Sequence, residues 1–104
     1  MLASIKNIHF IGIGGIGMSG IAELLHNQGF HITGSDLSKS SNVERLEELG
    51  IQVSIGHNSD NINELELVVY SDAIPKENCE LLEAKKKNIL CYSRAKMISQ
   101  IAKL

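Results

Sequence analysis

The chain has 104 residues, which is enough for one domain with a single core. Its net charge is −2, its 10 basic and 12 acidic residues are mixed along the chain, and only 4% of its residues are aromatic. This composition offers neither a basic patch nor stacking platforms, so a nucleic-acid partner is excluded. No apolar stretch reaches the ~20 residues of a membrane span, and residues 1–6 lack a signal-peptide core. We therefore expect a cytoplasmic protein that does not bind membranes.

The most informative stretch is a glycine-rich turn between a strand predicted at residues 7–12 and a helix predicted at residues 16–28. Gly12, Gly14 and Gly17 have the spacing G-x-G-x-x-G. At such a turn the backbone approaches a nucleotide diphosphate closely, and the N–H groups at the start of the helix bind it. Gly14 lacks a Cβ and would let a phosphate approach, whereas Gly17 would let the helix pack close to the sheet.

An acidic residue at the right distance strengthens this interpretation of the turn. Asp36 lies 19 residues after Gly17, at the end of the strand predicted at residues 30–35. A strand, a glycine turn, a helix and a following acid together form the dinucleotide-binding fingerprint, whereas the glycine spacing alone is a weak signal. The alternative is a turn that merely packs tightly.

The middle of the chain continues the alternation of helices and strands. Residues 41–44 have the spacing of a capping box, which predicts a helix that begins at Ser41. A strand follows at residues 51–55, and a short helical turn is expected near residues 61–64. The next strand, residues 67–70, is wholly apolar, as expected in a sheet that is covered on both faces.

The last third adds a helix at residues 77–87, a strand at 89–92 and a final helix capped by Ser93. Glu77 and Glu80 lie early in the first of these helices and three lysines lie late, an order that the helix dipole favours. The lysines are therefore interpreted as a solvated helix end.

Five strands that alternate with helices predict an α/β fold. We expect a Rossmann-like, doubly wound sheet of five parallel strands in three α/β/α layers, forming a single domain over residues 1–104. In such sheets ligands bind beyond the carboxyl ends of the strands, where the strand order reverses. Four segments are predicted to meet there: residues 12–19, 35–37, 56–58 and 71–74.

The positions of the histidines and cysteines in these elements indicate which of them could bind a ligand. His57 follows a strand, so a ligand role is predicted for it, whereas no role is expected for the three other histidines, His9, His26 and His31. Cys79 and Cys91 lack the spacing of metal ligands, and a disulfide is not expected in the cytoplasm. No metal site is predicted.

Several motifs together resemble the Mur ligases, a family of enzymes that build peptidoglycan. The matching segments are G-I-G-G-I-G-M-S-G at residues 12–20, G-S-D at 34–36, G-H at 56–57 and A-I-P at 73–75. The resemblance covers about residues 8–104 and is most specific at the double glycine followed by M-S-G. It implies an N-terminal domain that binds the UDP part of UDP-N-acetylmuramate and contains no catalytic residue.

The same resemblance implies how the complete enzyme works. A central domain would bind ATP and Mg²⁺ and phosphorylate the carboxylate of UDP-N-acetylmuramate, and L-alanine would then attack the acyl phosphate. The chain contains no G-x-x-x-x-G-K-[ST] segment, the loop that would bind ATP phosphates. We therefore expect the central and C-terminal domains of the enzyme to lie outside this chain and to be its partners.

By resemblance, the site residues are distributed over the four crevice segments. The turn backbone would hold the diphosphate, Ser19 would add a hydroxyl, and residues 36–37 would border the uridine. His57 would reach the nucleoside or the diphosphate, and residues 71–74 would line the sugar side. The substrate-binding set is Gly14, Gly15, Ile16, Gly17, Met18, Ser19, Asp36, Leu37, His57, Ser71, Ala73 and Ile74. Structural alternatives are a core position for Met18, a cap at Asp36 and a turn at Ser71.

Other proteins use the same fold and the same phosphate-binding turn. The alternatives are an NAD- or nucleotide-sensing regulatory module and the coenzyme domain of a dehydrogenase, in which Asp36 would bind an adenosine ribose. The second glycine, Gly15, and the M-S-G and G-H segments favour a UDP-sugar. A related ligase that recycles muramyl peptides is also left open.

The last helix carries an apolar face formed by Met97, Ile98, Ile101 and Leu104. In a complete enzyme this face would pack against the sheet or against the missing second domain. In the chain alone we expect it to be partly exposed, and exposed apolar surface favours association. Marginal order at this end or a weak homodimer is therefore predicted.

Overall fold

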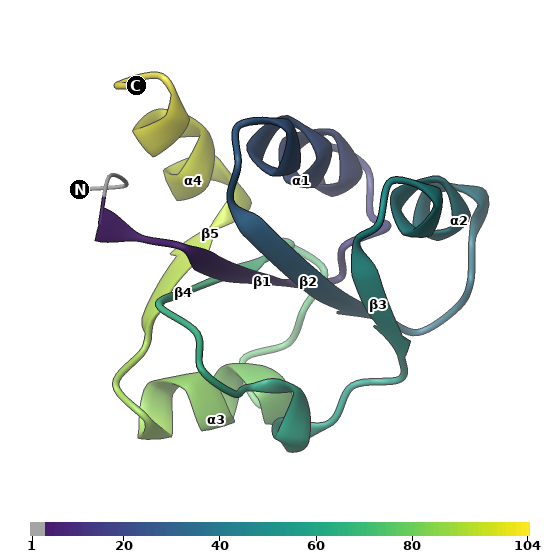
Figure 1. The fold of residues 1–104 in the computed structure, drawn as a ribbon. Coiled ribbons are helices and arrows are strands. Elements are labelled where there is room, and N and C mark those ends of the chain that lie inside the picture. The colour runs from purple at the N-terminus through teal and green to yellow at the C-terminus, as the bar shows by residue number, and fades with distance from the viewer. Residues whose placement is uncertain (1–3) are drawn as a thin grey trace.

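The computed structural model describes residues 4–104 and shows a five-stranded parallel sheet between two sets of helical elements (Figure 1). The strands are β1 (Asn7–Ile11), β2 (His31–Asp36), β3 (Gln52–Ile55), β4 (Leu67–Tyr70) and β5 (Leu90–Ser93). The helices are α1 (Met18–Asn27), α2 (Ser41–Glu48), α3 (Cys79–Lys86) and α4 (Arg94–Ile101), and a 3₁₀ turn, η2 (Ser59–Asn61), precedes β4.

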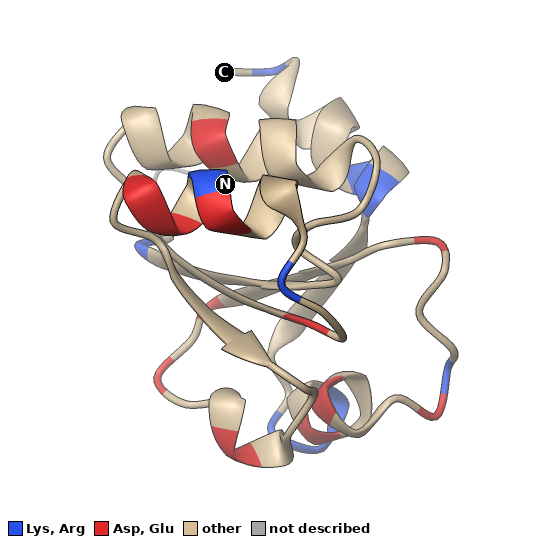
Figure 2. Ribbon diagram, turned by 90° about the vertical axis from the view of Figure 1, so that its right-hand side faces the viewer, with Lys and Arg blue, Asp and Glu red and all other residues tan. Residues whose placement is uncertain are grey.

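The strand order is β3-β2-β1-β4-β5, and every neighbouring pair is parallel. The order reverses between β1 and β4, which confirms the predicted Rossmann-like sheet. Figure 1 shows α1, α2 and α4 on one side, here called the upper face, and α3 with η2 on the other, the lower face. Lys and Arg lie dispersed among Asp and Glu over the ribbon (Figure 2).

The start of α1 and the N-cap of α2 differ from the sequence prediction. Helix α1 begins at Met18 rather than at residue 16, because Gly17 has a φ of +79° and cannot continue a right-handed helix. Helix α2 begins at Ser41 as predicted, but its N-cap is Ser40, whose hydroxyl accepts a hydrogen bond from the Val43 N–H. The predicted capping box was therefore placed one residue too late.

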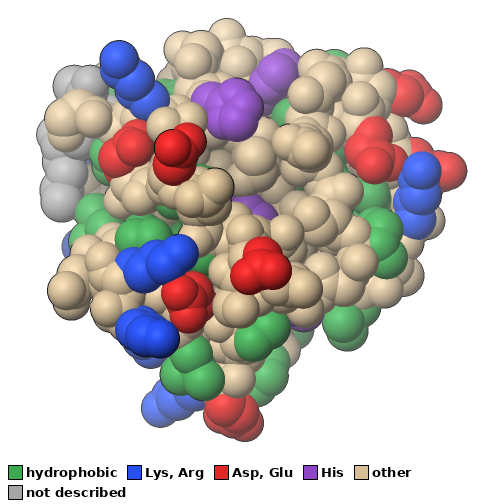
Figure 3. All heavy atoms as spheres, turned by 60° about the horizontal axis from the view of Figure 1, so that its bottom comes forward, with side chains coloured by type: hydrophobic (Ala, Val, Ile, Leu, Met, Phe, Trp, Pro, Cys, Tyr) green, Lys and Arg blue, Asp and Glu red, His purple; other side chains and the backbone are tan. Residues whose placement is uncertain are grey.

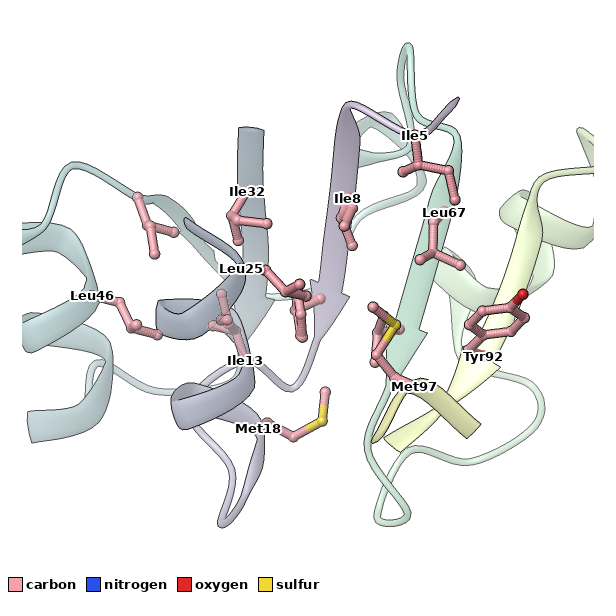
Figure 4. Close-up of a cluster of buried hydrophobic side chains, with 14 of the residues drawn as sticks. Ile5, Ile8, Ile13, Met18, Leu25, Ile32, Leu46, Leu67, Tyr92 and Met97 are labelled. Carbon is pink, nitrogen blue, oxygen red and sulfur yellow. The ribbon is translucent and has the colours of Figure 1, made fainter. Parts of the chain in front are cut away.

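The upper face holds the larger core, built from β-branched and aliphatic side chains of the sheet and the inward sides of α1, α2 and α4 (Figure 4). Met18 and Met97 are both completely buried there. The end of α4 is less covered, since Ile98 is 44% and Leu104 61% exposed. Weak self-association through this end stays a prediction.

The lower face is apolar on one half only. Ile11, Val68 and Leu81 belong to a small core beneath α3. The rest of this face, across β1, β2 and β3, is polar and borders an open cleft of about 410 Å³. The strand residues that line it are Asn7, His9, His31, Thr33, Gly34, Gln52 and Ser54. Figure 3, which brings this side forward, shows histidine side chains at the surface, bordered mainly by the tan of the backbone and other side chains. The link from β3 to β4 contributes only η2 there, so no long helix covers this half.

Gly34 of β2 is the position where the upper core leaves no room for a side chain. A Cβ there would lie 2.4 Å from Ile13 Cδ1 and 2.7 Å from Ile13 Cβ. Ile13 is fully buried and cannot yield. We expect Gly34→Ala to lower the free energy of unfolding by about 1–3 kcal/mol in a urea titration, the usual cost of overpacking.

Gly20→Ala is the matched control for this substitution. Gly20 lies in α1, and nothing lies within 4 Å of a Cβ at that position. The change should stabilise the chain by about 0.5–1 kcal/mol, because alanine loses less backbone entropy in a helix. Equal stability of the two variants would contradict the steric explanation.

Candidate functional site

A pocket of about 360 Å³ opens where the strand order reverses, at the carboxyl ends of β1 and β4. It contains seven residues of the sequence-predicted set: Gly15, Asp36, Leu37, His57, Ser71, Ala73 and Ile74. Gly12, Pro75 and Asn78 complete the lining, and of these Pro75 and Asn78 were not singled out from the sequence as site residues. The Asn78 side chain caps α3, where it accepts hydrogen bonds from the N–H groups of Glu80 and Leu81. A capping role explains an asparagine at this position, so the residue type alone did not indicate a pocket residue.

The five remaining residues of the predicted set lie on the adjoining turn and the first turn of α1, outside the pocket lining. They are Gly14, Ile16, Gly17, Met18 and Ser19. Met18 is fully buried, so its side chain fills the upper core. Any ligand contact from Met18 would therefore have to come from its backbone. Ile16 is 98% exposed at the tip of the turn.

The glycine turn keeps two backbone donors unused. Gly15 N–H donates to Gly12 O at 3.0 Å, and Met18 N–H donates to Gly15 O at 3.0 Å. The N–H groups of Ile16 and Gly17 make no hydrogen bond with the described part of the chain. They precede α1 directly, so they lie at the positive end of its dipole, where an anion is favoured.

The contacts of Gly14 lie within the protein. Its N–H donates to Asp36 Oδ2 at 2.8 Å, so this donor is already used. A Cβ on Gly14 would lie 2.8 Å from Val43 Cγ2, which means that the missing side chain makes room for α2. The other Asp36 oxygen accepts the Leu37 N–H at 2.7 Å. Asp36 therefore fastens the glycine turn to the end of β2 and also lines the pocket.

Arg94, which was not predicted as a site residue from the sequence, lies beside the glycine turn. An ideal Cβ on Gly17 would be 2.9 Å from Arg94 Nη1, so the guanidinium occupies the space that a side chain would fill. Gly17 thus makes room for a cation and does not serve the helix–sheet packing expected for it. The available signal was position, because Arg94 opens the helix after β5, next to β4 at the reversal.

A buried carboxylate joins the lower face to this pocket. Glu80 of α3 has no exposed surface, and all its partners are donors. Its Oε1 accepts from His9 Nε2 and Ser35 Oγ, each at 2.7 Å. Its Oε2 accepts from Asn58 N–H at 3.0 Å and Asn61 Nδ2 at 2.9 Å. One side chain therefore ties α3 to β1, β2, η2 and the loop after β3.

The histidine ring at the pocket belongs to the same network. Ser35 Oγ lies 2.8 Å from His57 Nδ1, and Glu80 Oε2 lies 3.6 Å from that nitrogen. His9 lies away from the pocket and is 1% exposed, with Thr33 Oγ1 at 2.8 Å from its Nδ1. His9 thus has a structural role that the sequence analysis did not assign.

Burial by itself raises the pKa of the Glu80 carboxyl, but its donors outweigh this effect and lower the pKa from 4.5 to about 2. Glu80 is therefore an anion throughout the neutral range. The sequence predicted only a helix-dipole role for it. Its spacing of four residues from buried Ala84 was the signal that it faces inward.

The cysteines and the remaining acids form no further site in the part of the chain that the structure describes. Cys79 is exposed and Cys91 half-buried, and burial raises the pKa of the Cys91 thiol. Residues 4–104 contain no group of three or more His, Cys, Asp or Glu side chains that could hold a metal ion. No helix among these residues is long and apolar enough to cross a membrane.

The parallel sheet with a pocket at its strand reversal defines a Rossmann-like α/β domain, a class in which nucleotide ligands are common. The Mur ligase family, catalytic domain, matches residues 7–104, and the chain belongs to the Mur ligase family. Its fold is that of the N-terminal domain of UDP-N-acetylmuramate–L-alanine ligases.

Curated relatives support this assignment. The chain is 54% identical over 101 residues to a UDP-N-acetylmuramate–L-alanine ligase of Brucella anthropi, covering 97% of this chain and 22% of that protein. It is 52% identical over 98 residues to the enzyme of the same name from Clostridium beijerinckii, covering 94% of this chain and 21% of the relative. The chain thus spans about a fifth of the length of the curated relatives it matches.

Solved structures agree with the family. A UDP-N-acetylmuramate–alanine ligase from Thermotoga maritima superposes with a TM-score of 0.90 and 31% identity over 95% of this chain and 23% of its own. A UDP-N-acetylmuramate:L-alanyl-γ-D-glutamyl-meso-diaminopimelate ligase from Neisseria meningitides superposes with a TM-score of 0.83 and 26% sequence identity. The match covers 93% of this chain and 31% of that one. Shikimate dehydrogenase from Aquifex aeolicus shares the fold alone, with a TM-score of 0.58 and 16% sequence identity. The match covers 90% of this chain and 44% of that one.

The Glu80 network makes the free energy of unfolding depend on pH. Because the folded-state pKa is lowered, the stabilisation is complete above the unfolded-state value of 4.5 and is lost as pH falls from about 5 to about 2. The lowering of the Glu80 pKa from 4.5 to about 2 corresponds to about 3 kcal/mol in the free energy of unfolding. Urea titrations at a series of pH values should show this decline.

Glu80→Gln should flatten that decline and lower stability at neutral pH by about 2–4 kcal/mol, because an amide cannot accept from all the donors that surround it. Glu83→Gln is the control, since Glu83 lies on the same helix and is paired with Lys87 at 3.5 Å. An acid profile of Glu80→Gln identical to that of the wild type would rule out Glu80 as its source.

Proposed function

We propose that this chain is the UDP-substrate-binding domain of a UDP-N-acetylmuramate–L-alanine ligase. The observation that carries the proposal is the junction of the pocket with an anion-binding corner. The corner consists of the free N–H groups of Ile16 and Gly17, the start of α1 and the Arg94 guanidinium. A cation and backbone donors beside an apolar pocket suit a diphosphate joined to a flat base.

The two parts of the ligand would occupy different regions. The diphosphate would lie at the corner, where Arg94 supplies charge-assisted hydrogen bonds and the dipole of α1 adds to them. The uridine would enter the pocket between Leu37 and His57, and the sugar would pass Ser71 and Ala73. Leu37 is 76% exposed without a ligand, as expected for an apolar side chain that a base covers on binding.

This chain's contribution to the reaction would be positioning. The wider reaction, in which ATP activates the carboxylate of UDP-N-acetylmuramate and L-alanine attacks it, needs groups that residues 4–104 do not supply. The sequence has no P-loop lysine, and the described residues have no acidic cluster for Mg²⁺. Central and C-terminal domains outside this chain would bind ATP and the amino acid. Holding one substrate rigidly can still account for a large part of a rate enhancement.

L-Alanine is favoured as the added group by the relatives, not by the pocket. The curated relatives at 48–54% identity carry the name UDP-N-acetylmuramate–L-alanine ligase, whereas the structure named as a tripeptide ligase is 26% identical. Both names include UDP-N-acetylmuramate, so a UDP site is common to the two. The part of the enzyme that selects the amino acid would lie outside this chain.

Calorimetry with UDP-N-acetylmuramate, UDP, NADH and ATP tests the proposal. We expect heat of binding from the two uridine compounds and none from NADH. Gly15→Val should abolish that heat, because its Cβ would lie 3.2 Å from Gly12 O and the remaining atoms would fill the turn. Binding of NADH alone would instead support a nicotinamide-binding or dehydrogenase domain.

Arg94 gives a sharper test of the diphosphate position. Arg94→Gln should weaken UDP binding by about tenfold, equivalent to about 1.4 kcal/mol, and reduce its dependence on salt. Lys96→Gln is the matched control, because Lys96 lies two residues farther along α4 with its Nζ 5.8 Å from the centre of the Tyr92 ring. If both variants bound UDP equally well, the diphosphate would not lie beside Arg94.

A further inference from the structure

The His57 ring is held from one side only. It follows β3, lines the pocket, and its side chain is 12% exposed. Its Nδ1 lies 2.8 Å from Ser35 Oγ. Its Nε2 makes no hydrogen bond with the described residues. The ring nitrogen left for a ligand is therefore Nε2, and what it can bind depends on which nitrogen carries the proton.

The Glu80–Ser35 contact determines where that proton lies. Glu80 accepts hydrogen bonds from four donors and is an anion, so it cannot donate to Ser35. The single Ser35 hydroxyl proton must therefore occupy the 2.7 Å contact with Glu80 Oε1. The Ser35 oxygen is then an acceptor toward the ring, and His57 Nδ1 must be the donor.

The opposite arrangement would leave two acceptors facing each other. If His57 Nδ1 were unprotonated, Ser35 would have to donate to it and would have no proton for Glu80. Two oxygen atoms would then face each other at 2.7 Å in a site with no exposed surface on Glu80 or Ser35. A buried carboxylate that loses a donor in this way is costly.

We propose that Ser35 and Glu80 are positioning residues that hold neutral His57 as its Nδ1–H tautomer, so that Nε2 is offered to the pocket as a hydrogen-bond acceptor. The neutral histidine side chain in water favours the Nε2–H form, so the protein reverses the intrinsic preference. The chain thereby gains a fixed acceptor at the end of β3, on a ring whose orientation the buried network sets.

This tautomer selects a chemical class of ligand group. An unprotonated Nε2 pairs with an N–H or O–H group, such as the imide N–H of a pyrimidine base or a sugar hydroxyl. It does not pair with the oxygens of an ionised diphosphate. The assignment of that group to the nucleoside of a UDP-sugar rests on the proposed function, whereas the tautomer does not.

Nitrogen-15 spectra of the imidazole rings test the inference without any ligand. The four histidines of the 104-residue chain are labelled and followed toward alkaline pH until their shifts stop changing, and His57→Gln identifies the signals of His57. We expect a protonated Nδ1 and an unprotonated Nε2 in His57. The Nε2–H form as the main species would overturn the inference.

Two serine variants separate positioning from general structure. Ser35→Ala should move His57 toward the Nε2–H form, because Nδ1 loses the acceptor at 2.8 Å and keeps only Glu80 Oε2, at 3.6 Å. Ser54→Ala removes a hydroxyl from the strand position paired with Ser35, one that bonds Asn61 and not His57, and should leave the tautomer unchanged. An equal tautomer shift in both variants would contradict a specific role for Ser35.

Adding ligands tests which group Nε2 recognises. UDP should move the Nε2 signal while Nδ1 keeps its proton, and pyrophosphate alone should leave Nε2 unchanged. An equal response to pyrophosphate would overturn the assignment to a donor group. If the Nδ1–H form is found but no uridine compound binds, the proposed function fails and the positioning of His57 stands.

Discussion

The burial of one carboxylate constrains the whole lower side of this molecule. Glu80 has no access to water, and an unpaired charge there would be untenable. Four donors from separate segments must therefore converge on its two oxygens, which fixes α3 relative to β1, β2, η2 and the loop after β3. The apolar core beneath α3 is small, so this polar junction, more than hydrophobic contact, specifies how that side is assembled.

The same junction relates the lower face to the proposed UDP pocket. The Ser35 hydroxyl is hydrogen-bonded to both Glu80 and His57, so it links the buried carboxylate to the ring that lines the pocket. On the other side of the strand reversal, Arg94 and two N–H groups without a partner among the described residues would be the donors to the proposed ligand. The site is thus divided into an acceptor region at the ends of β2 and β3 and a donor region at α1 and α4. A ligand with a base that carries an N–H donor at one end and an anion in the middle fits this division in one orientation only.

The strands, the parallel order and the pocket location were predictable because they depend on local patterns: apolar runs, glycine turns and the rule for strand reversal. Seven predicted site residues line the pocket for that reason. Arg94 and Glu80 were missed because their roles arise from contacts between segments far apart in sequence. The spacing singled out Gly14 and Gly17, but the neighbours that a side chain there would meet, Val43 and Arg94, come from distant segments and are visible only in three dimensions.

The polar half of the lower face has a consequence for how the domain opens. Separation of η2 from β1, β2 and β3 would hydrate amides, hydroxyls and imidazoles that border a cleft already open to water. Such an event exposes little apolar surface, so its heat-capacity change and its response to urea are both small. Local opening on this side therefore changes the heat capacity little, whereas opening of the two apolar cores carries most of the heat-capacity change of unfolding.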